Sequence, residues 1–76
     1  MKYKSESFFD IGRNAWLTGT ETRHLWVYLY KHGVKLHESE INEIERGFFD
    51  CQKRLYTINS VPDLLRDFLT IRKIVK

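Results

Sequence analysis

The apolar residues between Ile41 and Ile58 recur at alternating spacings of three and four positions. Residues spaced in this way fall on one side of an α-helix, so the segment 40–58 is predicted to be a helix with one continuous apolar stripe. The stripe consists of Ile41, Ile44, Phe48, Cys51, Leu55 and Ile58. It could fill the core of this chain, serve as both core and dimer seam, or form a free coiled coil. A coiled coil normally needs three or four sustained heptads, and this stripe spans about two and a half, so we favour the core.

Two further segments, 5–17 and 60–76, have the pattern of amphipathic helices. In the first, apolar residues recur at helical spacing: Phe8, Ile11 and Ala15. Ser5 or Ser7 can cap its N-terminus with a hydroxyl group. In the second, Pro62 falls in the first turn, where a helix tolerates proline. Both segments are therefore predicted to be helical.

The segment 22–33 is compatible with two structures. As a helix it is capped by Thr18 or Thr20 and ends at Gly33, a residue that readily adopts the left-handed conformation of a helix end. As a strand, its large residues alternate and belong mostly to types that favour sheets, so residues 24–37 could form a short hairpin. An isolated hairpin is only marginally stable in water, and we favour the helix.

These elements predict an all-α fold, a small bundle of three to four helices in a single domain that covers residues 1–76. The alternative is an α+β fold with the hairpin at residues 24–37. Gly47 lies inside the predicted third helix, where glycine costs about 1 kcal/mol relative to alanine, which indicates a close neighbour at that position. Chains of this size bury only about 60% of their unfolded surface, and association is one of the ways in which they gain stability.

The single cysteine, Cys51, excludes a disulfide within the chain and is typical of a reducing compartment. No apolar run approaches the roughly 18 residues of a membrane span, and the N-terminus lacks the pattern of a signal peptide. We therefore expect a cytoplasmic protein without membrane contact.

Residues with catalytic or metal-binding chemistry are few and scattered. His24, His32 and His37 do not have the spacing of a closed metal site. Cys51 lies within the apolar stripe, where burial disfavours the thiolate. The four glycines are isolated, so no phosphate-binding loop is present. We expect no enzyme activity, no cofactor, no metal and no small-molecule substrate.

The net charge of +3 is concentrated near the C-terminus. Residues 51–76 contain six Lys and Arg against two Asp, whereas residues 1–50 contain seven against eight acidic residues. The basic residues could contact nucleic-acid phosphates: Lys53, Arg54, Arg66, Arg72, Lys73 and Lys76. Cations at helix C-termini also have a simpler explanation, because they complement the helix dipole.

Eleven aromatic residues are more than a four-helix domain of this size can bury. Exposed Tyr and Trp are typical of binding hot spots, although tyrosines can also pack their rings while the hydroxyl groups stay in water. The candidate protein-binding residues are Trp26, Tyr28, Tyr30, Phe49 and Tyr56.

Taken together, the sequence predicts a small non-enzymatic regulatory or adaptor protein that binds another protein and forms a homodimer. The alternative is a DNA- or RNA-binding transcriptional regulator that uses the basic C-terminal third. The two alternatives differ in the surface that makes the contact.

Overall fold

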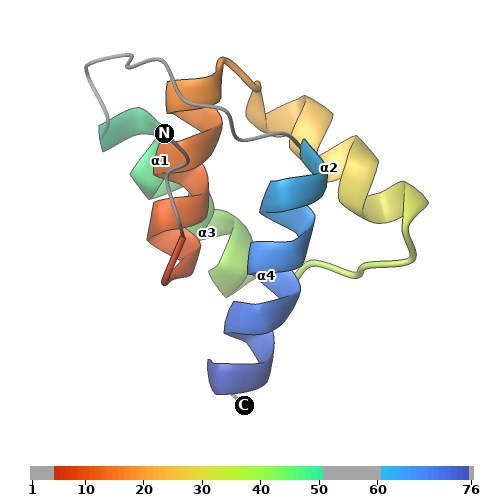
Figure 1. The fold of residues 1–76 in the computed structure, drawn as a ribbon. Coiled ribbons are helices and arrows are strands. Elements are labelled where there is room, and N and C mark those ends of the chain that lie inside the picture. The colour runs from red at the N-terminus through yellow and green to blue at the C-terminus, as the bar shows by residue number, and fades with distance from the viewer. Residues whose placement is uncertain (1–4, 51–60, 76) are drawn as a thin grey trace.

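Four α-helices make up the part of the chain that the computed structural model describes, residues 5–50 and 61–75, and no strand occurs there. The helices are α1 (Phe8–Thr18), α2 (Thr22–Lys31), α3 (Glu38–Asp50) and α4 (Val61–Val75). Figure 1 shows α1 in front of α3, with α4 between α1 and α2. The prediction of an all-α bundle is confirmed. Within the described residues, no helix combines the length and the apolar character needed to cross a membrane.

Residues 24–31 of the possible hairpin are helical and residues 34–37 form no strand, so the α+β alternative for residues 24–37 is wrong. Leu25 and Leu29 are one helical turn apart and both are fully buried. Gly33 has a positive φ of 76°, and the next amide, that of Val34, donates to the carbonyl of Leu29 at 3.0 Å. Burial of the two leucines and the left-handed glycine at the end therefore favour the helix over the strand.

Helix α1 begins at a reciprocal cap. The Ser7 hydroxyl accepts from the amide of Asp10, and the Asp10 carboxylate accepts from the amide of Glu6. The helix continues through Thr18 and ends at Gly19, which has a φ of 79°. Ser7 is thus the predicted cap residue.

The predicted caps of α2, Thr18 and Thr20, are wrong. The residue that precedes α2 is Glu21, and its side chain makes no capping hydrogen bond. Thr18 is the last residue of α1, and its hydroxyl donates to the carbonyl of Asn14 at 2.9 Å. Because α1 extends one residue further than the sequence pattern indicated, Thr18 belongs to the end of one helix rather than to the start of the next.

Helices α1 and α3 cross in direct backbone contact at two glycines. A methyl group on Gly12 would overlap the carbonyl oxygen of Ile44, and one on Gly47 would overlap the carbonyl oxygen of Phe9. The close neighbour predicted at Gly47 is therefore the backbone of α1. This crossing brings α1 into direct contact with α3, the helix that carries the apolar stripe.

The hydrophobic core lies between α1, α2, α3 and α4. The rings of Phe8 and Phe68 are 5.2 Å apart, which joins the start of α1 to the middle of α4. Trp16 packs edge-to-face on Phe48 at 5.1 Å, beside the crossing of α1 and α3. The buried core residues are Phe8, Ile11, Ala15, Leu25, Leu29, Val34, Ile44, Leu64, Phe68 and Ile71.

The described half of the apolar stripe faces the core of this chain. Ile44 is fully buried, and Ile41 and Phe48 are half-buried. The rest of the stripe, Cys51, Leu55 and Ile58, lies outside the described residues, as does the predicted extension of this helix beyond Asp50. Ile44 and Phe48 thus pack in the core of this chain, and the choice between a core and a shared core and dimer seam stays a prediction.

Candidate protein-binding surface

Helix α2 turns one side to the core and the opposite side to solvent. At 3.6 residues per turn, Val27 lies opposite the midpoint of Leu25 and Leu29, the two buried residues of this helix. Around Val27, within about 60° on the same geometry, lie four more exposed residues, Arg23, His24, Tyr30 and Lys31. We call the part of this surface formed by Arg23, Val27, Tyr30 and Lys31 the basic α2 face.

The basic α2 face exposes large apolar groups to solvent. Tyr30 is 80% exposed and Val27 is 52% exposed. Trp26, one turn before Tyr30, is half-buried and packs against the core cluster with part of its ring. The face therefore combines a rigid aromatic edge with freely accessible apolar atoms, the composition of a binding hot spot.

Positive charge surrounds these apolar groups. The range 22–37 contains Arg23, Lys31 and Lys35 and no Asp or Glu. All three side chains are exposed. Arg23 pairs with Glu21 at 3.1 Å, but an ion pair this exposed contributes little and leaves the guanidinium accessible. A partner on this face thus meets Arg23 and Lys31, and the range 22–37 presents no anion to it.

This concentration of charge was not among the sequence predictions. The sequence nevertheless contains this information, because a count of charged residues over one predicted helix and the loop that follows it is enough to find the positive charge. Counting residues 1–50 together conceals the signal, since the acidic residues of α3 cancel the basic residues of α2.

The predicted protein-binding residues do not form one surface. Tyr30 lies on the basic α2 face, and Trp26 lies at its edge. Tyr28 is half-buried on another side of α2, where its ring packs on His32 at 4.4 Å. Phe49 is 70% exposed but belongs to α3, the C-terminal half of which lies on the far side of α1 from α2 (Figure 1). Tyr56 lies outside the described residues.

Among the candidates for nucleic-acid contact, Arg72 has a structural role. Its guanidinium donates two hydrogen bonds to the Glu40 carboxylate, at 2.7 and 3.0 Å, and one to the carbonyl of Lys35 at 2.6 Å. The same guanidinium lies 4.7 Å from the centre of the Phe68 ring. Arg72 therefore joins α4 to the loop after α2 and to the first turn of α3.

Glu40 is held from two directions. It is the third residue of α3, and its carboxylate also accepts from the amide of His37 just before the helix at 2.9 Å. Burial alone would raise the pKa of Glu40, but the hydrogen bonds from Arg72 and His37 and the positive charge of Arg72 outweigh it. The pKa of Glu40 is therefore lowered, and the carboxylate is ionised at neutral pH.

The other candidate nucleic-acid contacts are dispersed. Arg66 is exposed and pairs with Asp63 at 2.8 Å, one turn earlier on α4. Lys73 is exposed near the end of the same helix. The remaining three, Lys53, Arg54 and Lys76, lie outside the described residues.

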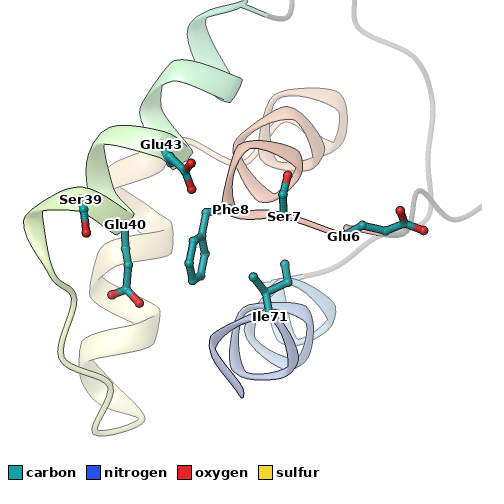
Figure 2. Close-up of a pocket in the computed structure, with 7 residues that line it drawn as sticks. All are labelled: Glu6, Ser7, Phe8, Ser39, Glu40, Glu43 and Ile71. Atoms are coloured by element: carbon teal, nitrogen blue, oxygen red, sulfur yellow. The ribbon is translucent and has the colours of Figure 1, made fainter. Parts of the chain in front are cut away.

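An open hollow of about 400 Å³ lies between the start of α1, the start of α3 and α4 (Figure 2). Phe8 and Ile71 form its apolar part, and Glu6, Glu40 and Glu43 also line it, with the Glu6 carboxylate directed away from Phe8 and Ile71. The Glu40 carboxylate is already engaged by Arg72. The hollow contains neither a nucleophile paired with a base nor, within the described part of the chain, a cluster of three metal-binding side chains.

Comparisons with known proteins identify no relative: no family model, no curated protein and no solved structure matches this chain. The candidate site therefore has to be evaluated on its own chemistry.

Proposed function

We propose that this chain is a non-enzymatic binding protein that acts by docking on another protein through the basic α2 face. The observation that carries the proposal is the exposure of Tyr30 together with Val27 on one face of α2. Tyrosine on a protein surface is a frequent anchor of protein interfaces, because its ring buries a large area at a small entropic cost.

The positions of these residues favour binding over a role in the fold. Leu25 and Leu29 already attach α2 to the core, so the side chains on the opposite side of the helix do not contribute to its packing. A partner that covers Tyr30 and Val27 would remove both from water, and each buried apolar side chain contributes roughly 1.5 to 3 kcal/mol. A regulatory or adaptor role in the cytoplasm is the activity that such a surface serves.

The alternative function, nucleic-acid binding through the basic C-terminal third, has weaker support. Arg72 is engaged by Glu40 and Lys35, and Arg66 is paired with Asp63. A phosphate would have to compete with these contacts for two of the candidate cations.

The proposal is tested with tagged chain incubated in an extract of the cells that encode it, after nuclease treatment. We expect wild-type chain to retain a specific protein and Tyr30→Ala to lose it by at least about tenfold, since a hot-spot truncation costs 2 kcal/mol or more.

The matched control is Leu69→Ala, which truncates another exposed apolar residue, on α4, and is expected to retain the partner. Far-UV circular dichroism of both variants should match that of wild type. Equal retention by Tyr30→Ala and wild type would contradict the proposal, as would a protein that is retained from untreated extract and lost after nuclease treatment.

A further inference from the structure

The outward face of α3 has the opposite charge to that of α2. The buried residues of α3 are Glu40, Ile44 and Gly47. Within about 50° of the opposite direction, at 3.6 residues per turn, lie residues 38, 42, 45, 46 and 49. We call four of them the acidic α3 face: Glu38, Asn42, Glu45 and Phe49.

The acidic α3 face resembles the basic α2 face in layout. Phe49 exposes 70% of its surface, as Tyr30 does on α2 with 80%. An open hollow on this face is lined, among the described residues, by Asn42, Glu45, Arg46 and Phe49. Each face thus presents one accessible aromatic ring between charged groups, and the α3 face offers a hollow in which a foreign ring could lie.

The charges on the two faces have matching separations. Arg23 and Lys31 are eight residues apart, or about 12 Å along the axis of α2 at 1.5 Å per residue. Glu38 and Glu45 are seven residues apart, or about 10.5 Å along α3. An antiparallel or parallel pairing of the two helices could therefore bring both cations near both anions at once.

The charge difference extends over the whole of both elements. The range 22–37 contains three basic and no acidic residues, whereas Glu38–Asp50 contains five acidic residues and one basic residue, Arg46. Arg46 lies on the same side of α3, about as far from its midline as Glu45, and a basic partner would meet it there. Glu40 is buried and paired with Arg72, so this side of α3 presents Glu38 and the half-buried Glu45 against Arg46, two negative charges and one positive charge. That balance of −1 is opposite in sign to the charge of the basic α2 face.

Within one copy the two faces cannot meet. The C-terminal half of α3 lies on the far side of α1 from α2 (Figure 1). We infer that the occupant of the basic α2 face is the acidic α3 face of a second copy of this chain. This inference rests on the proposed function, because it names the partner of the same surface. The contact joins unlike faces, so each pair leaves one face of each kind open and association proceeds head to tail.

The first test uses purified chain alone. Sedimentation equilibrium from about 1 to 200 μM should give an average mass above that of one chain, rising with concentration. Raising the salt from about 50 to 500 mM should lower that mass, because salt screens exposed opposite charges. A chain that stays monomeric throughout would overturn the inference.

The second test exchanges the charges. Arg23→Glu with Lys31→Glu makes the α2 face acidic, and Glu38→Lys with Glu45→Lys makes the α3 face basic. Each double variant alone should associate at least about tenfold more weakly than wild type, because like charges then face each other. An equimolar mixture of the two should associate again, since each reversed face meets its complement in the other variant.

Controls separate charge pairing from loss of fold. Far-UV circular dichroism should show wild-type helix content for both variants. Glu38 lies in the first turn of α3, where a cation is unfavourable because it opposes the helix dipole. If the double variant Glu38→Lys with Glu45→Lys unfolds, the single variant Glu45→Lys replaces it. A matched reversal away from both faces, Arg66→Glu on α4, should leave association unchanged. The inference would be overturned if none of the charge reversals weakened association. It would also be overturned if the equimolar mixture of the two double variants failed to associate.

Failure here is distinguishable from failure of the proposed function. If purified chain is monomeric but Tyr30→Ala still loses a protein captured from extract, the occupant is a foreign protein and only the inference fails. If Tyr30→Ala changes neither self-association nor capture, the proposed function fails as well.

Discussion

The Arg72 side chain connects α4 with segments of the chain that are distant from it in sequence. Its guanidinium contacts the Glu40 carboxylate, the Lys35 carbonyl and the Phe68 ring, three groups from three different segments. Both partners of the ion pair are largely shielded, with 21% of the Arg72 side chain and 9% of the Glu40 side chain exposed. Removing one partner leaves the other charge in a poorly hydrated position.

We therefore expect Arg72→Met to lower the free energy of unfolding by about 2 kcal/mol, less than for a fully buried pair because Arg72 keeps some contact with water. Arg72→Lys should cost less, since it keeps one charge but loses the two-pronged geometry. The measurement is urea denaturation followed by circular dichroism. Lys73→Met is the matched control on the adjacent, exposed position, and an equal loss in the control would contradict a specific role for Arg72.

The lowered pKa of Glu40 predicts a dependence of stability on pH. A carboxylate whose pKa is lower in the folded state stabilises the protein above its unfolded pKa, which is ordinarily 4.5. That contribution is lost as the pH falls through the folded pKa. Wild type should therefore lose more stability than Glu40→Gln when the pH is lowered from about 6 to 3, as measured by thermal unfolding. Parallel losses in the two proteins would show that Glu40 does not carry the effect.

The sequence indicates the environment of some residues and not of others. Tyr30 was a predicted binding residue because eleven aromatic residues are more than a domain of this size can bury, and it is 80% exposed. The pairing of Arg72 with Glu40 could not be predicted, because 32 residues separate them and local spacing rules reach only one turn. Arg72 was therefore assigned to a possible phosphate contact although its charge serves the fold.

At the scale of the elements, the crossing of α1 and α3 depends on the absence of two side chains. The backbone of each helix occupies the space that a methyl group on the other would need. We expect Gly12→Ala and Gly47→Ala each to lower the free energy of unfolding by about 3 kcal/mol or to prevent folding, because the helices must move apart. Thermal unfolding monitored by circular dichroism is the measurement.

Gly33→Ala provides the control for this effect. Gly33 has a φ of 76° and open space around its Cα atom, so a methyl group there meets strain in the backbone but no clash. The cost should be about 1 kcal/mol, the usual cost of a left-handed conformation for alanine. If Gly33→Ala were as damaging as Gly12→Ala, the steric explanation of the crossing would be wrong.

Helix positions were predictable because each apolar pattern has a period close to 3.6 over several turns. The end of α1 was misjudged by one residue, since Gly19 rather than Thr18 adopts the terminal conformation. The structure of α2 could not be decided from its alternating residues alone. Burial of Leu25 and Leu29 against α1 and α4 decides it, and that tertiary contact is not visible in local sequence.

At the scale of the whole molecule, charge is segregated by helix. The range 22–37 is basic, Glu38–Asp50 is acidic, and the two are consecutive in the sequence. Dividing the chain into a neutral first part and a basic last part therefore missed the feature that bears most on binding. The aromatic part of the candidate surface was predictable from composition, whereas its separation from Phe49 required the arrangement of the helices.

The close approach of α1 and α3 at Gly12 and Gly47 also bears on how the chain can vary during evolution. Any larger residue at either position requires the backbones of both helices to shift. We therefore expect homologous proteins to tolerate few single substitutions at these two positions. A relative too divergent to detect by overall similarity should still carry glycine at the fifth position of its first helix and the tenth of its third. An acidic residue at the third position of the third helix and an arginine in the fourth helix complete this pattern. Together with the two glycines, they define a sequence signature by which distant homologues could be found.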